Sequence, residues 1–510
     1  MNTAASQTPY SWPAFVQLEI DNCIRCGFCL PVCPTYKQTA LETASPRGRI
    51  ALLRAVVADE LEIGALEDQF SLCLGCRACE TACPAGVAYG RLFEQGRAAV
   101  HTAATVHTAA TVAGDPVAAG PVAAAPAGPG REHSAQGERP AQGERPAPDS
   151  PTALQRLKAL AARRQGPGHW LETLAIRHLF PSPRLLRLAG HLLWFYQVSG
   201  LAPLLRRVGF FGLLPDHLVE MEAILPRVPA PWARRSARDA TATASPALGP
   251  RAVVFTGCIQ DVVFSETNYN TGRLVAAAGA QLMDVPAQAC CGALHAHTGD
   301  LAGARRLARR NIAAFDDASV DVIVTNAGGC GAQLLEYPHL LEDDPAWAER
   351  ARTLAHKVQD ISAFLVEQGY DPTGSAAPAS SEGRRVTYQD SCHLVNGQKV
   401  KNEPRQLLRA LPDLEYREQV AADQCCGSAG IYNIVEPEMS GRILHDKMEN
   451  VKDTQAGLVA TANPGCLLQM RLGIQRAGLA GRVQAIHIVD LLAASLPDSP
   501  SDPFGEVNDP

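Results

Sequence analysis

Short apolar runs rich in β-branched residues recur in the second half of the chain, and each run is followed within a few residues by a cysteine. The four runs with their cysteines are RAVVFTGC (251–258), VDVIVTNAGGC (320–330), RRVTYQDSC (384–392) and GLVATANPGC (457–466). Runs of this kind are typical of buried strands. Helical stretches such as Leu301–Phe315 lie between them. This alternation predicts α/β domains with parallel sheets.

The cysteines of this half form two matching groups. The first group is Cys258, Cys290, Cys291 and Cys330, and the second is Cys392, Cys425, Cys426 and Cys466. The groups are offset by 134 to 136 residues, which marks an internal duplication. Both groups contain the sequence CCG, so we name the segments the first CCG repeat (249–375) and the second CCG repeat (383–497).

The CCG sequence predicts two thiolate ligands from one turn. Adjacent cysteines are poorly placed to form a disulfide with each other. The glycine that follows, Gly292 or Gly427, leaves room for the backbone and permits φ > 0. Because parallel sheets have their functional crevice at the carboxyl ends of the strands, we expect all four thiols of each group there. A further iron-sulfur cluster, a zinc ion, no permanent metal and purely structural cysteines remain the alternatives.

Composition narrows the class of protein. The chain has 510 residues, 46% of them hydrophobic, and a formal net charge of −6, which argues against a general nucleic-acid binder. The N-terminus has neither a basic start nor an apolar run, and the best apolar stretch, Leu188–Leu205, is interrupted by polar residues, two glycines and a proline. We therefore expect a cytoplasmic chain whose 16 cysteines stay reduced and serve metal binding or catalysis.

The remaining eight cysteines carry the most specific motif. Both CIRCGFCLPVCP and CLGCRACETACP match C-x2-C-x2-C-x3-C-P, with a constant offset of 50 residues. This spacing is the ferredoxin signature for [4Fe-4S] clusters, in which the fourth cysteine of each motif binds the other cluster. We expect one cluster on Cys23, Cys26, Cys29 and Cys83, and the other on Cys73, Cys76, Cys79 and Cys33. Zinc is the alternative, but zinc sites usually use two separated cysteine pairs. A close pair of clusters indicates electron transfer.

Two further segments separate this dicluster domain (1–95) from the CCG repeats. Residues 96–151 contain HTAATV twice and AQGERP twice, with Ala, Gly, Val and Pro between, and are predicted to be a disordered insertion. Residues 152–248 form a basic linker in which LLRLAGHLLWFYQ predicts a helix. The linker is interpreted either as an interfacial helix pair at the membrane or a quinone, or as a helical clamp on the dicluster domain or on a partner subunit.

The chain resembles the iron-sulfur subunits of bacterial glycolate oxidase, also called glycolate dehydrogenase. Beyond the cysteines, the resemblance rests on CGFCLPVCPTY, SPRGRI, GCGAQLLEY, QCCGSAGIYN and HDKMENV, and it covers most of residues 15–95 and 250–490. Related families are the lactate-utilisation proteins and the corresponding cysteine-rich subunits of anaerobic glycerol-3-phosphate dehydrogenase and of heterodisulfide reductase. One difference is that Gln333 and Gln469 stand where the full cysteine-rich motif has a fifth cysteine. The five-cysteine, noncubane cluster of heterodisulfide reductase is therefore not expected here.

The resemblance implies an electron-transfer subunit that is not catalytic alone. The sequence shows no G-x-G-x-x-G and no P-loop, so hydride chemistry is expected in FAD-containing, glycolate-oxidising partner subunits. Electrons would pass through two [4Fe-4S] clusters to a quinone or another acceptor, with possible contact to the cytoplasmic face of the inner membrane. The alternatives are a subunit of a lactate or glycerol-3-phosphate dehydrogenase complex, and a catalytic subunit like that of heterodisulfide reductase.

Five other side chains have two interpretations each. Arg47 and Arg49 lie between the two ferredoxin motifs and are read either as charges that steer a partner or raise a cluster potential, or as a salt bridge at a helix start. His295, His297 and His393 follow cysteine motifs. They are read either as substitute ligands or proton donors, or as histidines satisfied by local hydrogen bonds.

Overall fold

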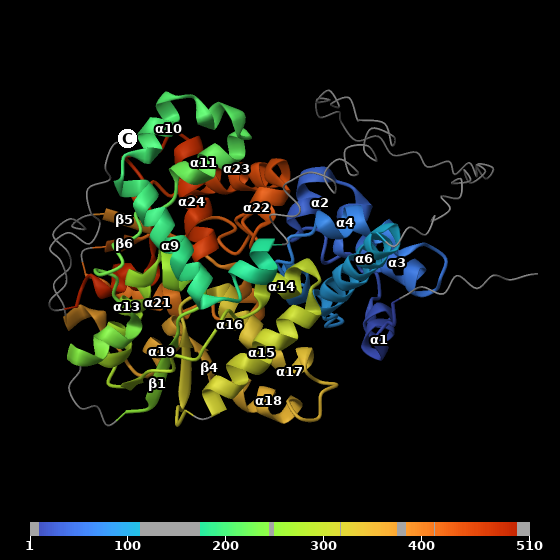
Figure 1. Cartoon of the computed structure of the whole chain (residues 1–510), viewed down its shortest axis with the longest axis horizontal. Coiled ribbons are helices and arrows are strands. Elements are labelled where there is room, and N and C mark those ends of the chain that lie inside the picture. Colours follow the sequence, from blue (N-terminus) through green and yellow to red (C-terminus); the bar gives the residue numbers. More distant parts are fainter. Residues whose placement is uncertain are drawn as a thin grey trace, which may run out of the picture. The chain divides into compact units, whose positions relative to one another are not determined.

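The computed structural model describes residues 10–112, 174–243, 249–316, 318–374, 384–412 and 414–496. The described residues 10–103 and 176–496 belong together in one compact unit. Figure 1 traces the chain and labels many of its helices and strands. Within the described residues, no helix is both long and apolar enough to cross a membrane.

The dicluster domain is built from short helices that are joined by the cysteine loops. Its elements are α1 (Ala14–Asn22), α2 (Pro34–Thr39), η1 (Glu42–Ala44), α3 (Pro46–Val57), η2 (Ile63–Leu66), α4 (Glu67–Ser71), α5 (Ala78–Thr81) and α6 (Tyr89–Val112). Helix α3 starts where the sequence favours it, because the Ser45 side chain accepts a hydrogen bond from the Gly48 amide and Pro46 occupies the first turn. Phe70 and Phe93 stack in the core behind the loops.

The prediction of a disordered insertion from residue 96 onward is wrong for its first part. Helix α6 continues to Val112 and includes both copies of HTAATV. Its first turns are anchored by the buried Leu92, Phe93 and Ala99, and adding residues to an existing helix costs far less than starting one. The rest of the predicted insertion, residues 113–151, lies outside the described residues, as do residues 152–173 of the linker.

The described part of the linker is helical, as predicted. It contains a π-helical turn, η3 (Ala175–Leu179), followed by α9 (Pro183–Val198), α10 (Leu201–Arg207), η4 (Phe210–Leu213), α11 (Asp216–Ala223) and η5 (Ala237–Thr243). Helix α9 buries Leu186 and Gly190 and packs on the first CCG repeat, where a Cβ at Gly190 would lie 2.6 Å from Val262. Helix α11 contacts the second repeat through Met221, whose sulfur accepts a hydrogen bond from Asn433. The linker therefore joins the two repeats.

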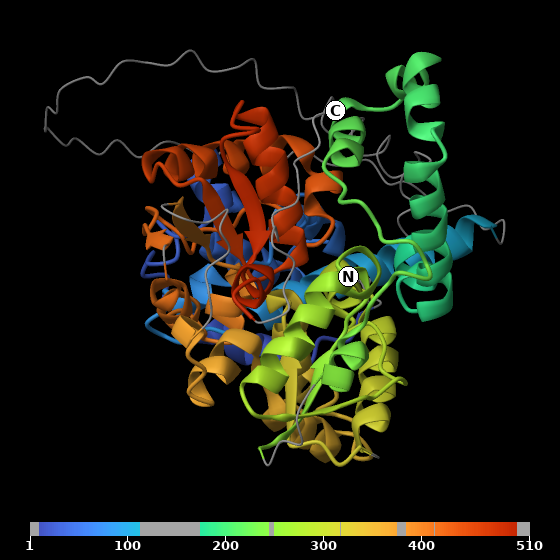
Figure 2. The same cartoon turned by 90° about the vertical axis from the view of Figure 1, so that its left-hand side faces the viewer.

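Each CCG repeat contains one four-stranded parallel sheet, which confirms the predicted fold class. The first sheet has the order β2-β1-β3-β4 and the second β6-β5-β7-β8, and both are flanked by helices (Figure 2). The strands are β1 (Arg251–Phe255), β2 (Gln281–Met283), β3 (Val322–Thr325), β4 (Val358–Asp360), β5 (Arg384–Gln389), β6 (Leu414–Tyr416), β7 (Leu458–Thr461) and β8 (Gln484–His487).

The helices of the two repeats follow the same plan. In the first repeat they are α12 (Ile259–Val263), α13 (Ser265–Ala277), α14 (Ala293–Thr298), α15 (Leu301–Asp316), α16 (Gly328–Leu335), α17 (Tyr337–Leu340), α18 (Ala348–Lys357) and α19 (Ile361–Glu367), with η6 (Pro372–Gly374) after them. In the second they are α20 (Cys392–Gly397), α21 (Glu403–Ala410), α22 (Tyr432–Val435), α23 (Pro437–Asp453), α24 (Pro464–Arg476) and α25 (Ile488–Ala493). One apolar core runs through both repeats, so they fold against each other.

The sheet register brings the cysteines together as predicted. Phe255 at the end of β1 pairs with Thr325 at the end of β3, so the loops that carry Cys258 and Cys330 leave the sheet side by side. In the second repeat, Gln389 at the end of β5 pairs with Thr461 at the end of β7, and the loops lead to Cys392 and Cys466.

Candidate functional site

The first ferredoxin loop forms a pocket that matches the predicted ligand set. Positive φ angles at Arg25 (56°) and Gly27 (88°) turn the chain tightly between its cysteines. The pocket has an empty volume of about 420 Å³ and an almost entirely apolar wall. Its cysteines are Cys23, Cys26, Cys29, Cys83 and Cys79. The four predicted ligands of one cluster thus line a single pocket, and Cys79 brings the other ligand set to its wall. The donor set fits a cluster with four thiolate ligands.

The second ferredoxin loop repeats this geometry at a buried position. Positive φ angles recur at Gly75 (63°) and Arg77 (62°), in the same places relative to the cysteines. Burial raises the pKa of Cys79, and the nearby Cys76, Cys73 and Cys33 raise it further. These four thiols are therefore close enough to interact, as the predicted ligand set requires. Because the pKa of Cys79 is raised, this thiol binds metal only with the release of its proton.

Two arginine side chains donate hydrogen bonds to residues around the second ferredoxin loop. Arg49 is buried, and it donates to the Gln69 carbonyl and to Thr35, whose hydroxyl lies 3.3 Å from the Cys33 sulfur. Although burial opposes it, the neighbouring Cys73 raises the pKa of Arg49, which keeps this cation beside the ligand set. Arg97 donates to the carbonyls of Phe70, Ser71 and Cys73.

Arg47 and Arg49 have different environments, and each environment corresponds to one of the two interpretations given for this pair. Arg47 forms a salt bridge with Glu42 at the start of α3, at 2.5 Å. Arg49 is instead a buried positive charge next to Cys33 and Cys73. Such a charge raises the reduction potential of a nearby cluster by favouring its more negative, reduced form.

The first CCG repeat brings its four thiols together in two close pairs. The Cys290 and Cys258 sulfurs are 3.6 Å apart, and the Cys291 and Cys330 sulfurs are 3.5 Å apart. Hydrogen bonding to Cys290, followed by burial, raises the pKa of Cys258. The turn is fixed from α15 by Asn311, whose side chain accepts from the Ala289 amide and donates to the Cys290 carbonyl.

The second CCG repeat has a similar turn with a different charge. The Cys426 and Cys466 sulfurs are 3.3 Å apart. Gly427 has φ 91°, and a Cβ there would lie 2.9 Å from the Ser440 carbonyl, so the position requires glycine. Hydrogen bonding with Cys425 and then with Cys466 lowers the pKa of Cys426, and the charge of Lys447 acts in the same direction.

A buried lysine, Lys447, lies next to the cysteine turn of the second repeat, where the sequence analysis predicted no charged side chain. It is fully buried on α23, and its ammonium group donates to the carbonyls of Ala421 and Ala422. Burial lowers its pKa to about 8, while the nearby Cys426 and Cys425 oppose that change. Among the described residues, no three His, Cys, Asp or Glu side chains are arranged around a point that would suit a single metal ion.

The second ferredoxin loop docks on the second CCG repeat. His393 donates to the Gly75 carbonyl at 3.0 Å, and Asn396 donates to the Cys76 carbonyl at 3.0 Å. Cys76 and Cys425 pack in one buried cluster, with Cys392 against it. After burial, Cys392 is the strongest influence that raises the pKa of Cys76. The structure thus brings two predicted sites into direct contact.

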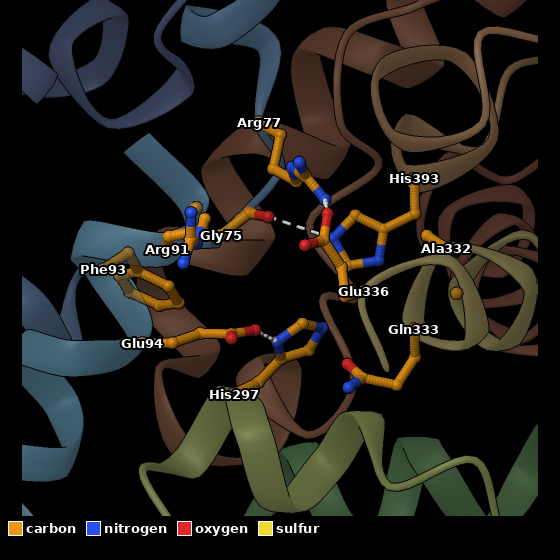
Figure 3. A pocket seen from close by; sticks show the side chains of 12 residues that line it. Gly75, Arg77, Arg91, Phe93, Glu94, His297, Ala332, Gln333, Glu336 and His393 are labelled. Carbon is orange, nitrogen blue, oxygen red and sulfur yellow. Dashed lines mark hydrogen bonds and ion pairs between the residues drawn. The ribbon is translucent and has the colours of Figure 1, made fainter. Parts of the chain in front are cut away.

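A polar pocket lies where the dicluster domain meets both repeats (Figure 3). His297 hydrogen-bonds to Glu94 at 3.2 Å, and its ring centroid is 5.1 Å from that of His393. Burial lowers the pKa of His393 to about 3, so this ring is neutral. His297 and His393 therefore have local partners, whereas both ring nitrogens of the fully buried His295 have none among the described residues.

Several of these residues were not singled out by the sequence. Arg97 and Asn396 lie in no quoted motif, and Lys447 lies in HDKMENV, which was quoted for the resemblance without a role for the lysine. For Lys447 a sign was available, since it falls on the apolar face of α23 at helical spacing from Ile443, Leu444 and Val451. Gln333 and Gln469 were noted only as departures from the five-cysteine motif.

Comparison with known proteins agrees with this geometry. A family model of a 4Fe-4S dicluster domain matches residues 19–87, and one of the cysteine-rich CCG domain matches residues 252–335 and 386–471. The protein is thus an iron-sulfur protein with two [4Fe-4S] clusters in its dicluster domain and a duplicated cysteine-rich domain. A third model, the linker region of the glycolate oxidase iron-sulfur subunit, matches residues 167–225.

The chain belongs to the family of glycolate oxidase iron-sulfur subunits, and so acts in electron transfer as a subunit of the glycolate oxidase complex. It is 43% identical over 479 residues to the probable glycolate oxidase iron-sulfur subunit of Bacillus subtilis, covering 93% of each chain. It is 25% identical over 479 residues to the glycolate oxidase iron-sulfur subunit of Escherichia coli, again with 93% of each chain covered. Lactate utilization protein A of Oceanobacillus iheyensis is 31% identical over 239 residues, which is 47% of this chain and 95% of that protein.

Proposed function

We propose that this chain carries electrons from an FAD-containing subunit that oxidises glycolate to glyoxylate to a quinone or another acceptor. The observation that supports the proposal most strongly is the chain of contacts from the first ligand set to the second repeat. Cys79 of the second set lines the pocket of the first set, and Cys76 of the second set packs against Cys425 of the second repeat. Iron-sulfur clusters supply one-electron carriers, which suit a relay of this kind.

We assign the ligands as two sets that exchange their fourth cysteine. One set is Cys23, Cys26, Cys29 and Cys83, and the other is Cys33, Cys73, Cys76 and Cys79. The apolar pocket around the first set and the mutual proximity of the second set support this assignment.

The exposed side of the first set is the proposed entry point for electrons. Cys26 is exposed, and the apolar side chains of Ile24 and Phe28 beside it are 67% and 64% exposed. Exposed apolar side chains next to a redox centre are typical of a docking surface. We infer that the flavoprotein docks here, because the second set is buried and has the second repeat as its neighbour.

Both CCG groups are proposed to bind metal as well. Each group gathers four thiols at the carboxyl end of a parallel sheet, with two of them on one turn. A further iron-sulfur cluster, a zinc ion and no permanent metal remain the candidates, and zinc would need the thiols to rearrange, since no three metal-binding side chains of the described residues surround a single point. Metal analysis separates the three.

The linker offers a surface for contact with the membrane. Along α9 and α10, one face exposes large apolar side chains next to arginines. The exposed residues are Leu185, Leu188, Leu192, Phe195, Val198 and Leu204, with Arg184, Arg187 and Arg207 beside them. Apolar and basic side chains on one helical face favour the surface of an anionic bilayer. Binding to phosphatidylglycerol vesicles but not to phosphatidylcholine vesicles, lost on replacing Leu188 and Leu192 by Ser, would support this contact. Equal binding of the protein to the two kinds of vesicle would argue that a partner subunit covers this face.

Metal content and spectroscopy test the main proposal. Purified without oxygen, the chain should contain about eight irons and eight acid-labile sulfides from its two cubanes. About sixteen irons would mean loaded CCG groups, and two zinc ions besides eight irons would mean zinc there. Glycolate with the flavoprotein subunit should then produce the EPR signals of reduced clusters. A folded chain without iron, or clusters that glycolate leaves oxidised, would contradict the proposal.

A further inference from the structure

The loops that end in the last cysteine of each CCG group, Cys330 and Cys466, are hydrogen-bonded to each other. The Gly329 amide of the first repeat donates to Oδ1 of Asn463 in the second repeat at 3.1 Å. Gly329 directly precedes Cys330, and Asn463 lies three residues before Cys466. The two cysteine groups are therefore connected by a short path of bonds, in addition to the apolar core that the repeats share.

Neighbouring hydrogen bonds keep these two loops in register. The Gly328 amide donates to the Ala462 carbonyl at 3.0 Å, and the Gln398 side chain donates to the Gly328 carbonyl at 3.0 Å. The His487 ring lies 2.9 Å from the Asn326 carbonyl. The contact between the loops is thus a fixed part of the joint between the repeats, and the bond from Gly329 to Asn463 lies within it.

The side chain of Asn463 has only one possible orientation. A backbone amide can only donate, so the atom that faces Gly329 must be the carbonyl oxygen Oδ1. The nitrogen Nδ2 then faces away from Gly329, and it donates to the Cys466 sulfur at 3.8 Å. One side chain therefore contacts the segment before a cysteine of the first repeat and the sulfur of a cysteine of the second.

The position of Asn463 in its helix shows that this arrangement replaces the usual one. Asn463 is the N-cap residue of α24, and an N-cap asparagine normally accepts a hydrogen bond from an amide of the first helical turn. No amide of α24 donates to this side chain, although the backbone is extended as an N-cap requires, with φ −160° and ψ 131°. The amide group serves the contact between the repeats instead.

The first repeat lacks a corresponding side chain. The residue three positions before Cys330 is Ala327, which is buried and has no polar side-chain atom. Hydrogen bonding to Cys426, followed by burial, raises the pKa of Cys466, and the bond from Asn463 opposes that change by favouring the thiolate. The bridge is therefore directional, because an amide of the first repeat holds a donor that acts on a sulfur of the second.

We propose that Asn463 couples the two CCG groups, so that metal bound by the first repeat stabilises the metal bound by the second. The inference rests on the proposed metal binding by both groups. A metal that holds Cys330 also holds the Gly329 amide before it, and this amide keeps Nδ2 of Asn463 directed at Cys466. Hydrogen-bond partners of ligating side chains orient those ligands and strengthen metal binding. Coupling between two binding sites is reciprocal, so the second metal also stabilises the first.

Two changes at Asn463 distinguish this role from helix capping. Asn463→Ala removes both hydrogen bonds. Asn463→Asp keeps the shape, the acceptor for Gly329 and the capacity to cap a helix, but its carboxylate cannot donate to the sulfur. Both variants should lose the metal of the second repeat about tenfold faster. Asn402→Ala is the matched control and should leave the rate unchanged, because Asn402 is an exposed N-cap residue of α21 in the same repeat.

A change in the first repeat tests the coupling itself. Gly329→Pro removes the donated amide hydrogen, and proline is tolerated in the first turn of α16, where amides have no partner within the helix. This variant should speed metal loss at Cys466, in the other repeat, about fivefold. Gly329→Ala is its matched control, because it keeps the amide and places a methyl group 3.5 Å from Oδ1 of Asn463, an ordinary contact distance.

The experiment uses the complete, anaerobically purified chain and follows single cysteines. Iodoacetamide is added together with a chelator, EDTA for zinc or bathophenanthroline for ferrous iron. Mass spectrometry of peptides then gives the rate at which Cys466 is alkylated as metal leaves. If Gly329→Pro does not fold, Cys290→Ser with Cys291→Ser removes the first metal instead. This pair should speed alkylation of Cys466 about fivefold in the unchanged chain and should add nothing in Asn463→Ala.

The outcomes distinguish the two proposals. A folded chain with about eight irons and no other metal would contradict the proposed metal binding by the CCG groups, and the coupling with it. Metal in both groups, with Cys466 alkylated equally fast in Asn463→Ala and Asn402→Ala, would overturn the coupling alone. An unchanged rate in Asn463→Asp would mean that the residue only caps α24. Equal rates in Gly329→Pro and Gly329→Ala would mean that the first repeat does not act on the second.

Discussion

The two CCG repeats have the same sheet order and the same cysteine pattern, yet their surroundings differ. In the first repeat, the thiols pack among residues of that repeat, and the neutral Asn311 fixes the turn. In the second, Cys392 and Cys425 adjoin Cys76 of the dicluster domain, and the buried cation Lys447 lies below the turn. Duplication therefore supplied two copies of one crevice, and each copy has different neighbours. The thiols of the second repeat pack against the dicluster domain, whereas Gly329 and Gln333 of the first line the pocket of Figure 3.

Removing the adjacent thiols of each repeat tests this difference most strongly. Cys425→Ser with Cys426→Ser, and separately Cys290→Ser with Cys291→Ser, should each remove the metal of its own repeat. Only the second-repeat pair should also change the EPR spectrum of the cubane bound by Cys76, because only there do the thiols pack against it. Iron analysis and EPR of both proteins measure the outcome. Identical changes in the cubane spectrum would remove the distinction between the repeats.

The stabilities of the two repeats should respond to pH in opposite ways, because a different titratable residue ends the fourth strand of each sheet. Asp360 caps α19 in the first repeat, and burial raises its pKa to about 7. His487 caps α25 in the second, and burial lowers its pKa to about 4. From about pH 4 to 7 the unfolded Asp360 is ionised while the folded one stays protonated, so the first repeat loses about 4 kcal/mol as pH rises. From about pH 6.5 down to 4 the unfolded His487 is protonated while the folded one is not, so the second repeat loses about 3 kcal/mol as pH falls.

Hydrogen exchange measures this prediction for each repeat in the intact chain. After correction for intrinsic rates, α19 should exchange faster toward pH 8 and α25 faster toward pH 5. Asp360→Asn should remove the first trend and His487→Asn the second, since asparagine keeps a capping side chain without titrating there. Parallel trends in both helices would show that neither buried group controls its repeat.

The two glutamines should differ in their contribution to stability. Gln469→Met removes two buried hydrogen bonds, the one that Asn433 donates to Gln469 and the one that Gln469 donates to Ser440, and should cost about 2 kcal/mol. Gln333→Met removes an amide with no protein partner, and should cost less than about 0.5 kcal/mol. Exchange of the α24 and α16 amides reports each loss. A larger cost at Gln333 would mean that its amide has a structural partner in the protein.

The smallest expected effect concerns the buried lysine. Lys447→Met removes the cation that favours the Cys426 thiolate, so the second repeat should lose its metal to a chelator about tenfold more readily, equivalent to about one pKa unit. Lys452→Met on the same helix is the matched control, because Lys452 is paired with Glu449 at the surface. Metal retention unchanged in Lys447→Met would show that the cation has only a structural role.

Local patterns in the sequence predicted the elements, and contacts between distant segments decided the rest. The strands before Cys258, Cys330, Cys392 and Cys466 followed from short β-branched runs bounded by turn residues. Helices α9 and α15 followed from apolar spacing. The extension of α6 was missed, because a repetitive Ala-Thr composition suggests disorder unless a folded helix already precedes it.

The site could be predicted only as far as ligands and spacing reach. Spacing gave the cysteine groups, but it did not show that Asn396 and His393 would dock on the second ferredoxin loop more than 300 residues away. Gln333 and Gln469 look equivalent in the chain. Their different roles depend on which neighbouring segment packs against each repeat, and this is a property of the folded protein.

The two ferredoxin loops are buried to different degrees, and this difference determines which of the two clusters is oxidised and lost first. Oxygen and peroxide reach an iron-sulfur centre by way of solvent, and Cys26 lies open at the surface while Cys73, Cys76 and Cys79 are enclosed. Exposure to air should therefore destroy the outer centre first and leave a chain that keeps its inner half yet accepts no electrons. A flavoprotein bound over Ile24 and Phe28 would shield that outer centre, so assembly itself protects the complex in an oxygenated cell.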